Sequence, residues 1–139
     1  MEKRSIIGYL AVFLLRKGQA LFLLFLLCLI TPRSIVVKAT VYQGIISQTD
    51  ETPNVTATGD KFNPLNPPRW IAVSRDLLEE FPYNSQVEIQ GTGIHDGIYK
   101  VKDTMHKRKL NQIDILIPST IEPGDPEYGY WQKVTISKI

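Results

Sequence analysis

Short runs of alternating apolar and polar residues occupy most of the chain after residue 36, and turn-forming residues separate them. Alternation with a period of two is typical of half-buried β-strands, and several short runs at close spacing favour a small sandwich or barrel. We expect about five to seven strands closed into a barrel, because closure leaves no exposed strand edge. The runs lie at 36–46, 70–74, 85–91, 97–103, 113–117 and 131–139.

Two segments interrupt this strand pattern. Residues 75–80 are predicted to form one short helix, which stops before Pro82 because proline cannot continue a helix. Residues 47–69 are rich in turn formers and are long for a connection inside a compact domain. Such connections are usually functional or disordered, so this segment is a candidate for a functional loop.

Residues 1–39 differ from the rest and are predicted to be an export signal. Basic residues precede the apolar run 6–15, and a second apolar run of 11 residues follows at 20–30. The second run fits a signal peptide and is too short to span a hydrocarbon core of about 30 Å as a helix. Cleavage after Ala39 would leave residues 40–139 as the mature domain, and an uncleaved membrane anchor is the alternative.

Charge and cysteine content narrow the range of possible functions. Residues 1–39 hold six Lys/Arg and one Glu, which leaves ten Lys/Arg against thirteen Asp/Glu in residues 40–139, a net charge of −3. The main electrostatic argument for nucleic-acid binding is therefore missing. The only cysteine, Cys28, lies in the leader without the small preceding residue of a lipid-attachment site. The mature domain must rely on its core instead of disulfides.

Two aspartates at the edges of apolar runs raise a question of chemistry. Asp103 ends one predicted strand and Asp114 lies in the next, although strands disfavour aspartate because its side chain competes for backbone hydrogen bonds. Each can be explained as the cap of a turn. The other explanation is a site, where the hairpin expected between the two residues brings their carboxyls together.

Five short motifs follow one another along the chain. They are TATG (56–59), RWIAVS (69–74), VEIQGTG (87–93), VKDT (101–104) and IDIL (113–116). Together they resemble the bacterial three-aspartate domain, a family that includes the catalytic part of membrane-bound lytic transglycosylase A and the stationary-phase muralytic enzymes. The resemblance implies a small six-stranded double-psi β-barrel with one short helix, and peptidoglycan as the substrate.

Two of the three family aspartates match this sequence. Asp103 and Asp114 keep the family interval, whereas the first aspartate falls on Ser74 or, two residues later, on Asp76. The glycine after the second aspartate is replaced by Met105, and HKRKLNQ replaces the Gly-rich segment that follows. The family triad is therefore incomplete here.

The resemblance assigns Asp114 as the catalytic acid/base and Asp103 as its electrostatic partner. Glycosidic cleavage needs an acid to protonate the leaving oxygen, and in a lytic transglycosylase the same group then deprotonates the muramyl 6-hydroxyl to give a 1,6-anhydro sugar. A neighbouring carboxylate would raise the pKa of the acid by like-charge repulsion. No cofactor or metal is implied, and the spacing of His95 and His106 matches no metal-ligand pattern.

Further candidates for substrate binding come from the motif segments and the basic loop. They are Thr56, Thr58, Gly59, Ser74, Thr104, Lys107 and Tyr128. Structural explanations compete with each of them: a plain turn for the TATG segment, a solvated loop tip for the lysines, and a place in the core for the tyrosine.

The predicted function is that of an exported monomeric enzyme, in the periplasm, in the cell envelope or secreted, that cleaves the glycan strands of peptidoglycan. The alternative is a non-catalytic glycan-binding module, because expansin-like and rare-lipoprotein-A-like proteins use the same barrel. The missing first aspartate favours this alternative. A third interpretation is an envelope scaffold that contacts the membrane through its uncleaved leader. No nucleic-acid partner is expected.

Overall fold

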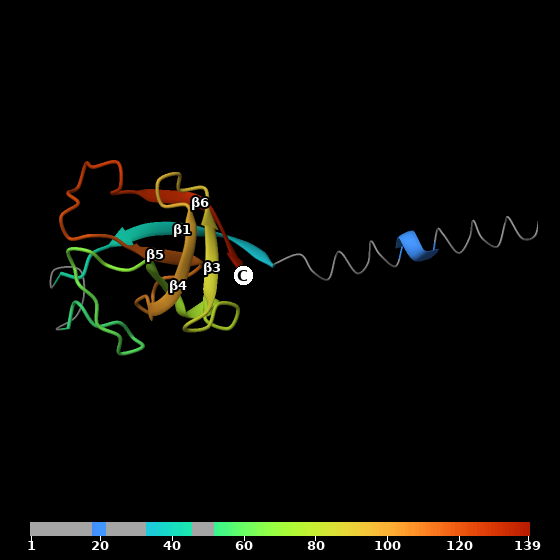
Figure 1. Cartoon of the computed structure of the whole chain (residues 1–139), viewed down its shortest axis with the longest axis horizontal. Coiled ribbons are helices and arrows are strands. Elements are labelled where there is room, and N and C mark those ends of the chain that lie inside the picture. Colours follow the sequence, from blue (N-terminus) through green and yellow to red (C-terminus); the bar gives the residue numbers. More distant parts are fainter. Residues whose placement is uncertain (1–17, 22–32, 46–51) are drawn as a thin grey trace, which may run out of the picture. The chain divides into compact units, whose positions relative to one another are not determined.

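A computed structural model describes residues 18–21, 33–45 and 52–139 (Figure 1). The chain divides into two compact units, Met1–Pro32 and Arg33–Ile139. Only a short helical segment of the first unit is described, so most of the predicted export signal lies outside the described residues. No helix among the described residues is long and apolar enough to cross a membrane.

Six strands of the second unit close into a barrel. Their order around the barrel is β1, β5, β2, β4, β3, β6, and β6 pairs back onto β1. The prediction of a mainly β fold, with a small six-stranded barrel and one short helix, is confirmed. The strands are β1 (Ser34–Tyr42), β2 (Trp70–Val73), β3 (Gln86–Gln90), β4 (Gly97–Thr104), β5 (Gln112–Leu116) and β6 (Tyr130–Lys138), and the 3-10 helix η1 is Arg75–Leu77.

Two of the neighbouring strand pairs are parallel, so the barrel is not a simple meander. β1 pairs with β5 and β2 with β4 in parallel, while the remaining pairs are antiparallel. β2 therefore lies between β4 and β5 and pairs with both. The prediction of a hairpin between Asp103 and Asp114 is wrong. β4 and β5 do not pair with each other, because β2 lies between them.

Alternate residues of the strands fill the interior of the barrel. Most of them are β-branched, which suits the pleated surface of a strand. Each such side chain stabilises the fold by about 1.5–3 kcal/mol when fully buried, so this core can hold a domain without disulfides. The core consists of Val37, Ala39, Ile71, Val73, Leu77, Phe81, Val87, Ile89, Tyr99, Val101, Ile113, Ile115, Ile117, Val134 and Ile136.

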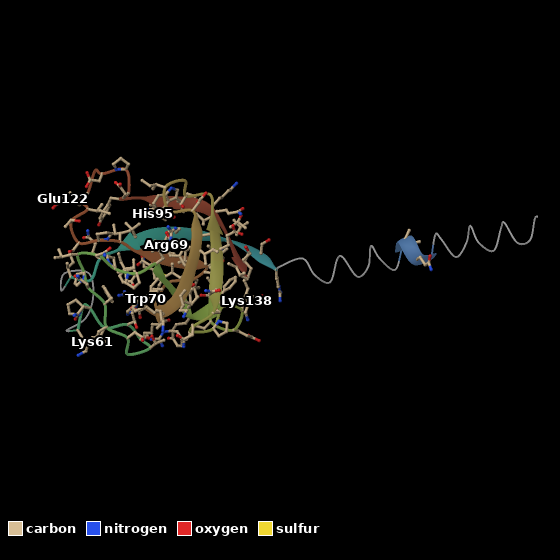
Figure 2. All side chains as sticks on the ribbon, viewed as in Figure 1. Lys61, Arg69, Trp70, His95, Glu122 and Lys138 are labelled. Atoms are coloured by element: carbon tan, nitrogen blue, oxygen red, sulfur yellow. The ribbon has the colours of Figure 1, made fainter. Side chains whose placement is uncertain are left out.

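A second apolar cluster lies on the outer face of the strands β1, β5 and β2, at positions that alternate with the core residues. Its buried members are Tyr42, Phe62, Ala72, Met105 and Leu116, and Trp70 packs against them. Phe62 comes from the long connection and meets Trp70 edge-on, with ring centroids 6.1 Å apart. The connection therefore covers this outer face, while Lys61 extends from it toward solvent (Figure 2).

The start of the barrel lies within the segment predicted to be the leader. β1 begins at Ser34, and its first residues pair with β6. Val37 and Ala39 are both buried in the core. The predicted boundary after Ala39 thus falls in the middle of a strand, and its use as a cleavage site stays a prediction.

Candidate functional site

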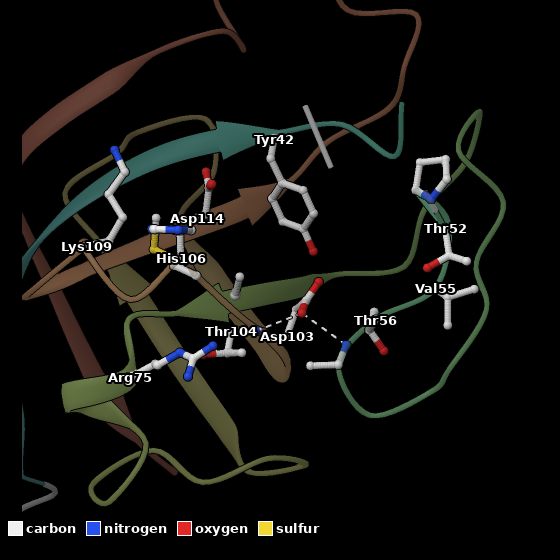
Figure 3. A pocket seen from close by; sticks show the side chains of 14 residues that line it. Tyr42, Thr52, Val55, Thr56, Arg75, Asp103, Thr104, His106, Lys109 and Asp114 are labelled. Atoms are coloured by element: carbon white, nitrogen blue, oxygen red, sulfur yellow. Dashed lines mark hydrogen bonds between the residues drawn. The ribbon is translucent and has the colours of Figure 1, made fainter. Parts of the chain in front are cut away.

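A pocket of about 620 Å³ opens on the outer face of the barrel (Figure 3). Its floor is made by β1, β2, β4 and β5, one wall by the connection around residues 52–57, and another by the loop that follows β4. The lining residues are Tyr42, Thr52, Pro53, Val55, Thr56, Ala57, Ala72, Arg75, Asp103, Thr104, Met105, His106, Lys109 and Asp114.

Asp103 and Asp114 both line this pocket, on opposite sides of Ala72. Ala72 of β2 is the cross-strand partner of Asp103 on β4 and of Asp114 on β5. Directly paired residues project from the same face of a sheet, so the two carboxyl groups share the outer face. Two strand spacings of about 4.8 Å separate their backbones, and the small alanine side chain leaves the space between them open.

A register shift in β4 places Asp103 on this face. Ile71 pairs with Val101, but the next residue, Ala72, pairs with Asp103, so Lys102 is an extra residue in β4. Val101 is a core residue, and strict alternation would point Asp103 inward as well. The bulge reverses that direction, as bulges beside functional sites often do.

Two backbone N–H groups hold the Asp103 carboxylate. Ala57 donates to its Oδ1 at 3.0 Å and Thr104 donates to the same oxygen at 2.8 Å. The first of these bonds docks the TATG turn against the end of β4, and Thr58 adds a backbone bond to the Lys102 carbonyl at 3.3 Å. Asp103 therefore has a structural task as well as a place in the pocket.

Asp114 lies in a different environment. Its Oδ1 accepts a hydrogen bond of 2.8 Å from the Thr40 hydroxyl, which in turn accepts one of 3.0 Å from Gln112 Nε2. Burial raises the pKa of Asp114 from its ordinary value of 3.8 to about 6, although the Thr40 bond and the charge of Lys109 lower it. The charge of Asp103 also raises this pKa, but it is the smallest of these causes. Burial, and not the like-charge repulsion expected from the sequence, is thus the main cause of the raised pKa of Asp114.

Three basic or titratable side chains stand around the two aspartates. Arg75, His106 and Lys109 line the pocket, and Figure 3 shows Lys109 and His106 on the Asp114 side and Arg75 below. Lys109 and His106 belong to the segment HKRKLNQ, where the sequence does not resemble the three-aspartate family. This departure from the family pattern therefore brings positive charge to the site.

The structure brings only some of the other predicted residues to the pocket. Thr56 and Thr104 line it, whereas the remaining candidates do not. Lys107 is exposed on the loop, and Tyr128 packs against the barrel core. Thr58 donates to Asp60 at 2.6 Å within its own turn. Gly59 has a φ of 80°, which the turn requires, and a Cβ there would meet no atom within 4 Å.

Ser74, which falls where the family has its first aspartate, is fully buried and outside the pocket. Its Oγ accepts a hydrogen bond of 3.1 Å from the Gln112 N–H, and so ties the end of β2 to β5. Asp76, the other candidate, does not line the pocket either. Burial works against ionisation of Asp76, but hydrogen bonds from Ser74 and Asn111 outweigh it and lower the pKa.

The sequence analysis missed Tyr42, Thr40, Ala72 and Arg75 at this site. Val37, Ala39 and Val41 face the core, so Thr40 and Tyr42 must face outward, and this alternation could be found in the sequence. What the sequence does not reveal is that β1 lies beside β5, with Thr40 opposite Asp114. Within the described ranges, no group of three His, Cys, Asp or Glu side chains is placed to hold a metal ion.

Solved structures that match this chain have low sequence identity to it. No protein-family model matches the chain, and no curated protein matches it in sequence. A Streptomyces papain inhibitor aligns with 16% identity and a TM-score of 0.49 over 77% of this chain and 94% of its own. A mutant Clavibacter michiganensis expansin in complex with cellohexaose aligns with 13% identity and a TM-score of 0.46, over 77% of this chain and 50% of its own. At this level of similarity neither structure assigns a function to this chain.

Proposed function

We propose that the pocket binds a glycan strand and that Asp114 is the general acid/base that cleaves its glycosidic bond. The observation that carries the proposal is a half-buried aspartate whose pKa is raised to about 6 and that shares a pocket with a second aspartate. A carboxyl with this pKa is still partly protonated near neutral pH, as a general acid must be.

In the proposed reaction Asp114 donates one proton in the first step and recovers one in the second. In the first step the protonated Asp114 carboxyl donates its proton to the glycosidic oxygen while the bond from that oxygen to C1 breaks. The Asp103 carboxylate, fixed by the Ala57 and Thr104 N–H groups, stabilises the positive charge that develops at C1. In the second step Asp114 takes the proton of the 6-hydroxyl of the same sugar, whose oxygen bonds to C1 and closes a 1,6-anhydro ring.

Charge around the pocket supports a glycan that carries acidic groups. Arg75 and Lys109 line the pocket beside the two aspartates, although the domain as a whole has more acidic than basic residues. Peptidoglycan presents carboxylates on the peptides attached to its glycan strands. These carboxylates are suitable partners for guanidinium and ammonium groups.

Digestion of purified sacculi by the full chain tests the proposal. The wild-type protein should release 1,6-anhydro-muropeptides, detected by mass spectrometry, and Asp114→Asn should lower the rate by about 10²–10⁴-fold. Release should also fall as the pH rises above about 6, because Asp114 then loses the proton that it must donate. Asp125→Asn, at an exposed position outside the pocket, is the matched control. Equal release by the Asp114 variant and the wild type would remove Asp114 from its role.

A non-catalytic glycan-binding module is the second candidate, and the position of Ser74 favours it. The serine that falls on the first family aspartate is buried outside the pocket, so among the described residues two carboxyl groups, not three, face a ligand there. A module of this kind would co-sediment with sacculi and release no muropeptide at any pH. That pair of results would reject the enzyme and retain the glycan site.

A further inference from the structure

Tyr42 presents a buried hydroxyl group with no partner to the pocket. The tyrosine ends β1 and is only 8% exposed. Among the described residues, its Oη is the one buried side-chain oxygen or nitrogen that makes no hydrogen bond. Figure 3 shows the ring beside Asp114, with the hydroxyl pointing toward the side of the pocket that holds Asp103.

The unpaired hydroxyl has a cost that a phenylalanine would avoid. Burying a polar group without a hydrogen bond is unfavourable, and native structures keep few such groups without a functional reason. The aromatic ring alone would serve the apolar cluster with Ala72, Met105 and Leu116. The oxygen atom is therefore the part of Tyr42 that packing does not explain.

The same surroundings keep this hydroxyl protonated. Burial raises the pKa of Tyr42 far above its usual range, and the charges of Asp103 and Asp114 raise it further. The phenol is thus an O–H donor at neutral pH, and it is not a base. A donor that faces a ligand site requires an acceptor on the ligand.

We propose that Tyr42 binds substrate directly, by donating a hydrogen bond from its hydroxyl to an oxygen of the sugar that lies between Asp103 and Asp114. This inference rests on the proposed glycan site and adds a specificity-determining residue to it. The sugar unit must present a hydroxyl, ring or carbonyl oxygen at the end of β1. A ligand without such an oxygen would leave the buried donor unpaired and be discriminated against.

The barrel contains a matched control at Tyr99. This tyrosine is also buried, but its hydroxyl donates to the His95 carbonyl at 2.9 Å and accepts from Arg69 at 3.0 Å. It belongs to the core and does not line the pocket. Tyr42→Phe removes a hydroxyl without a partner, whereas Tyr99→Phe removes one with two partners.

The test measures thermal unfolding and co-sedimentation with purified sacculi for the full chain and both variants. Tyr42→Phe should melt at the same temperature as the wild type or higher, and should bind sacculi about 3- to 10-fold more weakly. Tyr99→Phe should melt at least about 4 °C lower and bind as the wild type does.

The results that would contradict the role of Tyr42 can be distinguished from those that would contradict the glycan site. Wild-type affinity in Tyr42→Phe would overturn the role of Tyr42 and leave the glycan site intact. A melting temperature lowered as much as that of Tyr99→Phe would show that the hydroxyl supports the fold, which also overturns it. If the wild type neither binds nor digests sacculi, the proposed function fails, and the substrate role of Tyr42 fails with it.

Discussion

At the scale of single residues, two aspartates on one face differ because of what surrounds them. Asp103 lies at the end of β4 and accepts two backbone N–H bonds, whereas Asp114 is half-buried beside β1 and accepts a hydrogen bond from the Thr40 hydroxyl. Two carboxyl groups in unlike environments can take unlike roles in one reaction. This contrast makes Asp114 the acid and Asp103 the fixed negative charge in the proposed mechanism.

The raised pKa of Asp114 predicts how the stability of the domain depends on pH. Because its folded-state pKa of about 6 lies above the ordinary value of 3.8, the folded chain holds this proton more tightly than the unfolded chain. Its stabilising contribution is complete below pH 4 and is lost as the pH rises through 6. The loss amounts to about 3 kcal/mol. Chemical denaturation of Asp114→Asn between pH 4 and 7 should lack this decline.

Asp96→Asn gives the contrasting result when the same measurement is extended below pH 4, because the folded-state pKa of Asp96 lies below its ordinary value of 3.8. Hydrogen bonds from the Thr92 side chain and nearby backbone amides lower the pKa of Asp96, so its contribution is lost as the pH falls through the folded-state pKa. The two variants should therefore change the pH profile of stability in opposite directions. Profiles that run parallel for Asp114→Asn and the wild type would contradict a raised pKa at Asp114.

The sequence predicted these residues unevenly. Asp103 and Asp114 were singled out because their interval resembles a family motif and because aspartate is unexpected in a strand, and both line the pocket. Tyr42 was not found, since a tyrosine that ends an amphipathic strand looks like any other half-buried aromatic residue. Whether Tyr42 reaches the pocket depends on which strand lies beside β1, and the local sequence pattern does not reveal that neighbour.

At the scale of elements, the bulge in β4 and the end of β2 decide which side chains reach the pocket. Periodicity located all six strands, because alternation is a local property. It also implied that Val101 and Asp103 point the same way, which the extra residue Lys102 prevents. A one-residue shift reverses the face of every following side chain, and no composition signal announces it.

Ser74→Ala tests whether the serine at the first family position serves the fold or the site. The Gln112 N–H would lose its acceptor in a buried setting, and Asp76 would lose a hydrogen bond. We expect the free energy of unfolding to fall by about 1–3 kcal/mol. Digestion or binding of sacculi at temperatures well below unfolding should not change. If the variant instead unfolds like the wild type but no longer binds or digests sacculi, Ser74 serves the functional site and not the fold.

At the scale of the whole molecule, the barrel depends on strands that are distant in sequence. β1 pairs with β5 and β6, so the first strand is held by the last two. Thr40 reaches Asp114 only because of this closure. The closed class of the fold was predictable from many short strands, but the strand order was not, because non-local parallel pairing leaves no periodic signal in the sequence.

The same closure predicts where the chain can be shortened. A chain that starts at Arg33 keeps all of β1, whereas one that starts at Thr40 loses the residues that pair with the end of β6. It also loses Val37 and Ala39, which are 1% and 0% exposed. The lost burial and pairing cost several kcal/mol, which is comparable with the roughly 5–15 kcal/mol that stabilises a typical domain. Thermal unfolding followed by circular dichroism should therefore show a cooperative transition for the Arg33 start and none, or one at much lower temperature, for the Thr40 start. Equal transitions would mean that the first half of β1 is dispensable. The predicted outcome would place any leader cleavage that preserves the barrel before Ser34 and not after Ala39.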